Sequence, residues 1–190
     1  MRISRFAKLT LLVSVVTVGS VAAVHAGPIT AGTVEFSPSL AFNRSSYTPA
    51  GGGAAGSVTH LNLTASLGRA LNDRFEVMGG VIVQHRDLAS VGYTGEGAAV
   101  GGQYNFPAQG NVIPFVSANV GIVRFSSNGV TDRSVLAPML RVGFRSMIGE
   151  ARSLNVSFGF QHEENPKSSL EDSGNMFDVG IGMSMFRSHS

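Results

Sequence analysis

Apolar and polar side chains alternate along most of the chain, in eight separate segments. In the first of them Val34, Phe36, Leu40 and Phe42 take even positions, and small polar residues take most of the odd ones. A period of two is typical of a β-strand with one apolar face. The predicted strands are residues 33–43, 58–67, 75–86, 97–106, 112–125, 136–148, 153–162 and 175–186. After residue 26 no segment has the periodicity of a helix.

The predicted strands are long for a globular protein. They run to roughly 10–13 residues, whereas the common length is about 5–6. At about 3.3 Å per residue and a tilt of about 40°, such a strand rises ~30 Å, which is the thickness of a bilayer core. Strand length therefore favours strands that cross a membrane.

The connections between the predicted strands alternate in length. The longer ones are rich in Gly, Ser, Asn and Pro, and the others are short turns. The longer connections are 44–57, 87–96, 126–133 and 163–174, and the short turns lie near 69–73, 107–111 and 149–152. Long loops on one side and short turns on the other are typical of outer-membrane barrels. An even number of strands places both termini on the short-turn side, which faces the periplasm.

The composition of the two faces indicates which one points outward. The polar face consists mainly of Gly, Ser, Asn, Thr and Gln, which suit the narrow lumen of an eight-stranded barrel. The apolar face consists of Val, Leu, Ile, Phe and Met, which suit lipid. The chain has no Trp and three Tyr, so we expect phenylalanines to serve as the interfacial aromatic residues. The alternative is a soluble barrel of the lipocalin kind, with its apolar face inside.

The first 26 residues have the features of a secretory signal peptide. Arg2, Arg5 and Lys8 precede an apolar run, and small or branched residues lead up to Ala26. The apolar run is shorter than the ~20 residues that a spanning helix needs. We therefore predict a cleaved leader, residues 1–26, and a single outer-membrane β-barrel domain, residues 27–190.

Removal of the leader changes the charge of the chain. The leader holds three basic and no acidic residues, so eleven basic and twelve acidic residues remain, with a net charge of −1. The basic isoelectric point therefore gives no reason to expect nucleic acid as a partner. Charged residues make up 14% of the chain and there is no cysteine. This excludes disulfides and cysteine metal sites, and it is unusual for a soluble cytosolic domain, where about 25% is charged.

Three passages resemble a known family. They are SLGRALNDRFEVMGGVIV at 66–83, PFVSANVGIV at 114–123 and MFDVGIGMSMF at 176–186. The chain resembles the small eight-stranded outer-membrane β-barrels, that is, the OmpA transmembrane domain and OmpX-like proteins. The resemblance implies an all-β, antiparallel, up-and-down transmembrane barrel in the cell outer membrane of a Gram-negative bacterium. It also implies outer-membrane lipid, lipopolysaccharide and the barrel-assembly machinery as partners. Phe186 departs from the outward alternation of the last strand, and four residues follow it.

Several ionisable residues fall on the inward face. We expect them to form a polar network in a filled lumen, because an unpaired ion there is costly. The alternative is a gate or a selective pore. We expect Arg141 and Arg145 to share the carboxylates of Glu35 and Glu76. The full set of predicted lumen residues is Glu35, His60, Glu76, Arg86, Arg141, Arg145 and Asp178.

One passage bears on catalysis. FQHEEN, residues 160–165, resembles the His-x-Ser-Asn site of outer-membrane lipid A deacylases at His162 and Asn165. Glu164 stands where the nucleophilic serine belongs, so acyl-enzyme chemistry of that type lacks its nucleophile. We predict no catalytic residue, no metal site and no cofactor.

The sequence thus favours a non-enzymatic outer-membrane barrel that contributes to envelope integrity or recognises an unknown extracellular ligand through its outer loops. Three alternatives stay open: a narrow pore for small solutes, a soluble exported barrel that binds a ligand, and a lipid A-modifying enzyme.

Overall fold

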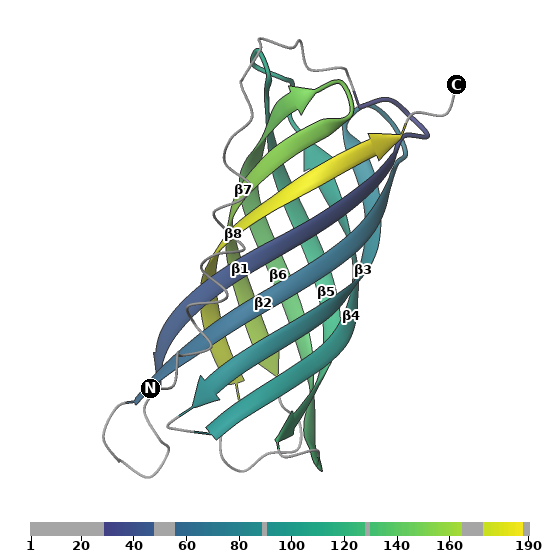
Figure 1. The fold of residues 1–190 in the computed structure, drawn as a ribbon. Helices are drawn as coiled ribbons and strands as arrows, with labels where there is room; N and C mark the ends of the chain where they lie inside the picture. Colours follow the sequence, from purple (N-terminus) through teal and green to yellow (C-terminus); the bar gives the residue numbers. More distant parts are fainter. Residues whose placement is uncertain (1–28, 48–55, 89–90, 128–129, 165–172, 188–190) are drawn as a thin grey trace, which may run out of the picture.

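The computed structural model describes residues 29–47, 56–88, 91–127, 130–164 and 173–187. Eight antiparallel strands pair in chain order, and the first pairs with the last to close a barrel (Figure 1). They are β1 (Val34–Tyr47), β2 (Gly56–Ala70), β3 (Phe75–Leu88), β4 (Val91–Asn105), β5 (Val112–Ser127), β6 (Val130–Gly149), β7 (Arg152–Glu164) and β8 (Ser173–Arg187). The predicted all-β, eight-stranded up-and-down barrel is confirmed. The described residues include no helix long and apolar enough to cross a membrane.

The strands are strongly staggered around the barrel. Following hydrogen-bonded partners once around leads from Phe186 to Met176 on the same strand, a displacement of ten residues. Such a stagger accompanies the tilt that closes a sheet of this size. Closure removes every free sheet edge, and a lipid-embedded backbone requires this because lipid offers it no hydrogen bonds.

The two ends of the barrel differ, as the sequence predicted. At one end, here called the turn end, short connections 71–74, 106–111 and 150–151 join the strands, and β1 starts beside the end of β8. Gly110 has a φ of 66° in one of these turns, a conformation that favours glycine. The opposite end is called the loop end. Most residues that connect strands there, and the proposed leader 1–26 with its cleavage site, lie outside the described residues.

The strands reach farther at the loop end than the sequence predicted. β1 continues to Tyr47 and β6 begins at Val130, within segments predicted as long loops. These extensions are polar on both faces, so the alternation that marks a strand is missing from them. Backbone pairing does not depend on that alternation and continues. The boundaries predicted for the long connections were therefore wrong.

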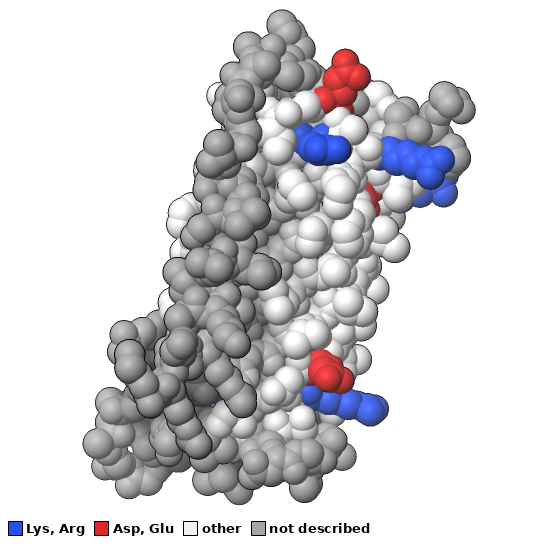
Figure 2. All heavy atoms as spheres, in the orientation of Figure 1, with Lys and Arg blue, Asp and Glu red and all other residues white. Residues whose placement is uncertain are grey.

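The outward face is apolar, as predicted. Large apolar side chains are exposed on all eight strands, and Leu67, Val100, Ile122 and Phe177 are each at least 60% exposed. Figure 2 shows this surface as a broad band with charged side chains only toward its two ends, on the face in view. Aromatic pairs flank the band: Tyr104 packs edge-on against Phe106 near the turn end, and Phe160 lies against Phe177 near the loop end. The band is the surface that a bilayer core would cover.

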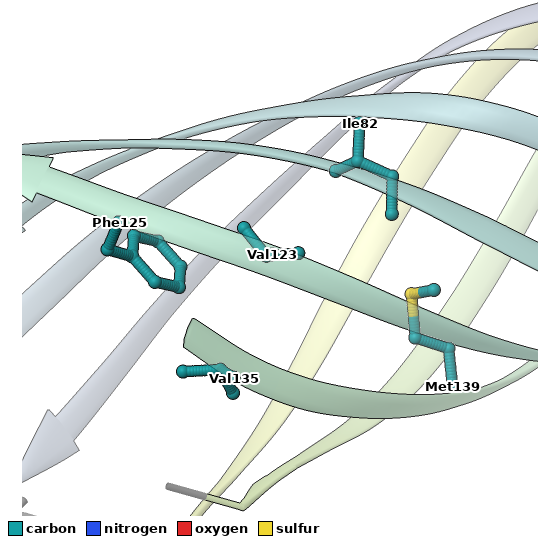
Figure 3. Close-up of a cluster of buried hydrophobic side chains, with 5 residues drawn as sticks. All are labelled: Ile82, Val123, Phe125, Val135 and Met139. Atoms are coloured by element: carbon teal, nitrogen blue, oxygen red, sulfur yellow. The ribbon is translucent and has the colours of Figure 1, made fainter. Parts of the chain in front are cut away.

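The inward face is not uniformly polar, and here the sequence analysis was wrong. Two apolar clusters occupy inward positions at different heights in the lumen. The upper cluster, in the half toward the loop end, consists of Ile82, Val123, Phe125, Val135 and Met139 (Figure 3). The lower cluster, at the turn end, consists of Ile29, Ala70, Ile113 and Met147, with Phe186 packed against it. Polar residues lie between the two clusters.

Candidate functional site

The most deeply buried charges form a layer directly above the lower cluster. Arg145 projects from β6 across the lumen toward β1 and β3. Its Nη2 lies 3.1 Å from Oε2 of Glu35, and its Nη1 lies 3.3 Å from Oε1 of Glu76. The three side chains are between 1% and 4% exposed. One guanidinium therefore links two carboxylates on separate strands, and we call these three residues the ionic layer.

Neutral donors complete the ionic layer. The Ser184 hydroxyl donates to Oε1 of Glu35 at 2.5 Å, and the Asn105 amide donates to Oε1 of Glu76 at 2.6 Å. The Asn155 amide in turn donates to the Ser184 hydroxyl at 2.6 Å. The layer holds one more carboxylate than guanidinium. These donors stabilise the surplus negative charge, which would otherwise be buried without sufficient partners.

Aromatic rings pack around the same guanidinium. The Arg145 guanidinium carbon lies 5.4 Å from the Phe186 ring centroid and 5.7 Å from that of Phe115. Both distances fall in the range of a cation–π contact. Phe186 thus faces the lumen, which explains why it breaks the outward alternation of the last strand.

Above the ionic layer the lumen contains a polar cavity of about 100 Å³. Its wall consists mainly of small side chains, among them Ser37, Ser66, Ser117 and Ser157, and it extends to Arg141. A polar space of this size has room for several water molecules.

Arg141 does not share the carboxylates of Glu35 and Glu76, and this prediction was wrong. Its Nη2 lies 3.3 Å from Oδ2 of Asp178. Gly159 explains the pairing, because it is the strand partner of Arg141 on one side and of Asp178 on the other. A Cβ at Gly159 would lie 2.7 Å from the Asp178 carboxyl carbon, so the absent side chain leaves the space in which the ion pair forms.

The upper lumen is divided between a polar and an apolar side. Asn43, His60 and Gln84 are buried on β1, β2 and β3, and they line a small pocket of about 20 Å³ together with Asp178. The upper cluster occupies the opposite side. Arg86 is buried there, with its guanidinium carbon 4.1 Å above the centre of the Phe125 ring.

All seven residues predicted for the lumen therefore lie on inward positions, but they form separate groups. Glu35, Glu76 and Arg145 form the ionic layer, Arg141 pairs with Asp178, and His60 and Arg86 lie nearer the loop end. The sequence analysis missed the neutral partners Ser184, Asn105 and Asn155. Their inward parity was visible in the sequence, but nothing in it indicated which carboxylate each would reach.

The possible catalytic histidine lies elsewhere. His162 is half-buried on β7, on the outward side of the alternation that places Gln161 inside. In the described part of the chain, no group of three or more His, Cys, Asp or Glu side chains could hold a metal ion. The described lumen therefore offers ion pairs and hydrogen bonds.

A membrane-type barrel with an apolar exterior and a filled lumen defines the class: the chain has the fold of the small eight-stranded outer-membrane β-barrels. Among solved structures it is similar to Neisserial surface protein A, with a TM-score of 0.60 and 15% identity over 82% of this chain and 97% of that one. The N-terminal β-barrel domain of Pseudomonas aeruginosa OprF gives a TM-score of 0.56 and 16% identity over 83% and 98% of the two chains. Outer membrane protein OprG of the same species gives 0.55 and 11% over 86% and 99%.

No protein-family description and no curated protein sequence matches the chain. At these identities the structural likeness concerns the fold. The barrel spans nearly the whole of each similar chain.

Proposed function

We propose that the protein is a non-enzymatic, non-conducting outer-membrane barrel whose role lies at its surface, in envelope integrity or in recognition through the loop-end connections. The observation that carries the proposal is the filled lumen. A path along the barrel axis meets the lower cluster, the ionic layer and then the upper cluster. The polar cavity of about 100 Å³ lies between these obstacles and does not by itself supply a route for solutes.

Two of the alternatives have less support. A soluble ligand-binding barrel would place its apolar face inside and its charged face in water, whereas this barrel exposes large apolar side chains on every strand. A lipid A-modifying enzyme of the deacylase type would need a hydroxyl nucleophile beside His162. The sequence has Glu163 and Glu164 there.

Ion conductance distinguishes the proposed closed barrel from a narrow pore. We expect planar bilayers that contain the inserted protein to show no discrete conductance steps. Insertion is verified in the same preparation by a band whose gel mobility changes on boiling. Stable conductance steps from inserted protein would contradict the closed barrel and favour the pore.

A second experiment separates the two surface roles. A strain that lacks the protein is complemented with the wild type or with a variant in which residues 48–55 and 165–172 are replaced by short Gly-Ser linkers. If the variant restores detergent resistance, the barrel itself supports the envelope. If it inserts but fails to restore resistance or surface binding, the loop-end connections carry the role. A change in lipid A mass on expression of the wild type would instead indicate an enzyme.

A further inference from the structure

Three arginines form a row on the outer surface at the turn end. Arg152 lies on β7, Arg187 on β8 and Arg69 on β2, and all three side chains are exposed. Each alternates with an inward neighbour: Ser153 is fully buried, and Phe186 packs against the lower cluster. The three guanidinium groups therefore extend from the outside of the barrel.

The strand register brings the row together. Val34 on β1 is the partner of Arg187 on one side and of Arg69 on the other. Neighbouring strands lie about 4.8 Å apart, so the two arginines are anchored about 10 Å from one another. Arg152 pairs with Met185, two residues before Arg187, and so lies diagonally beside it. The row thus crosses four consecutive strands.

No acidic side chain of the described residues neutralises this row. Glu35, the nearest carboxylate along β1, is buried and paired with Arg145. Asp73 and Glu150 are exposed in the neighbouring turns, but the ion pairs found in the described part of the barrel include none with Arg69, Arg152 or Arg187. The row therefore carries three positive charges that lack a carboxylate partner there.

An apolar tier lies directly beside the arginines, on the side of the bilayer core. Phe36 pairs with Met185 on β8 and with Leu67 on β2, one strand repeat from the Arg187–Val34–Arg69 line. Phe36, Met185 and Leu67 are 40%, 38% and 62% exposed. Positive charge and exposed apolar surface are thus stacked in the order in which a phospholipid places its phosphate and its acyl chains.

The opposite end of the barrel has a different arrangement. There the outward residues Glu96 and Arg124 are direct strand partners on β4 and β5, and both are exposed. An acidic and a basic side chain placed opposite one another balance their charge. The uncompensated positive charge is thus a property of the turn-end row, and Arg124 provides a matched control.

We propose that Arg69, Arg152 and Arg187 bind the phosphate groups of anionic phospholipids in the membrane leaflet at the turn end. A guanidinium keeps its charge and donates to two phosphate oxygens in a planar fork. Arginine side chains can extend from an apolar surface to the level of the headgroups. The proposal rests on the membrane embedding in the proposed function.

Native mass spectrometry tests the proposal. The protein is expressed from its complete sequence, extracted in a non-ionic detergent and mixed with phosphatidylglycerol or with phosphatidylcholine of the same acyl chains. We expect the wild type and Arg124→Gln to retain phosphatidylglycerol preferentially. We expect the triple variant Arg69→Gln/Arg152→Gln/Arg187→Gln to lose the preference, by about fivefold for each arginine removed. The corresponding triple lysine variant keeps the charge and should fall between them.

Three outcomes would overturn the proposal. One is an unchanged preference in the triple glutamine variant, and another is an equal loss in Arg124→Gln. The third is displacement of retained phosphatidylglycerol by inorganic phosphate at the same concentration, which would indicate a site for free phosphate rather than for lipid. All variants are first checked for the boiling-dependent gel shift. Recovery of the wild type from the soluble fraction would instead contradict the proposed function before any lipid is added.

Discussion

At the scale of single residues, Arg145 has the largest predicted effect on stability. Its removal leaves Glu35 and Glu76 buried without their shared cation. Loss of one partner from a buried ion pair typically costs about 3–5 kcal/mol. We therefore expect Arg145→Ala to lower the urea midpoint of the folded, gel-shifted band far more than Arg141→Ala, because Arg141 is 15% exposed and has a single ion-pair partner. Equal midpoints for the two variants would contradict a dominant ionic layer.

Gly159 provides a second prediction at this scale. Gly159→Ala introduces a methyl group where the Asp178 carboxylate lies, so the Arg141–Asp178 pair should separate. We expect a loss of about 1–3 kcal/mol in unfolding free energy. The double variant Gly159→Ala/Asp178→Asn should lose little more than either single variant, because both act on one pair. Gly149→Ala is the control, since nothing lies within 4 Å of a Cβ built there.

The lumen residues also show how far the sequence could lead. The period of two predicted which residues face inward, and Glu35, Glu76 and Arg145 do so. It gave no height along the barrel axis, because height depends on a stagger that only the backbone pairing sets. Arg141 was therefore assigned to the wrong carboxylates. Runs such as Val81-Ile82-Val83 are apolar on both faces, and this hid the upper cluster.

At the scale of elements, the seam between β1 and β8 is the weakest part of the barrel wall. Its ladder ends at Phe42–Val179, although β1 continues to Tyr47 and β8 starts at Ser173. Pro38, which has no N–H to donate, lies where the pairing is interrupted between Phe36 and Ser39. Beyond the ladder the Asn43 amide donates to the Phe177 carbonyl. A side-chain bond thus stands where backbone bonds are missing.

Hydrogen exchange should report this seam. We expect the amides of residues 43–47 and 173–178 to exchange faster than those in the middle of β5 and β6, which are paired along nearly their whole length. Asn43→Ala should increase the exchange around Phe177 and leave β5 unchanged. Uniform protection of β1 and β5, measured by NMR or mass spectrometry, would contradict a weak seam. The sequence predicted that both strands exist, but it could not show where their pairing stops.

At the scale of the whole molecule, membrane embedding depends on the outward apolar band. Val100 is the central outward residue of β4, between Glu96 toward the loop end and Phe106 beyond the turn end of the strand. It is 62% exposed and pairs with Val120 in the same band. If lipid covers the band, an arginine at position 100 would lie near the middle of the bilayer. If the barrel were soluble, the same side chain would simply enter water.

Val100→Arg therefore tests the embedding directly. We expect it to lower the unfolding free energy in lipid vesicles by about 2–4 kcal/mol, since that is the cost of arginine at the midplane of a barrel. Thr94→Arg, an outward substitution two residues beyond Glu96 on the same strand, should cost about 0–1 kcal/mol because it lies near the interface. The measurement is urea unfolding in vesicles, followed by the gel shift because the chain has no tryptophan to serve as a fluorescent reporter. Similar stabilities for the two variants would mean that lipid does not cover the band, and the apolar exterior would then need a protein partner to cover it.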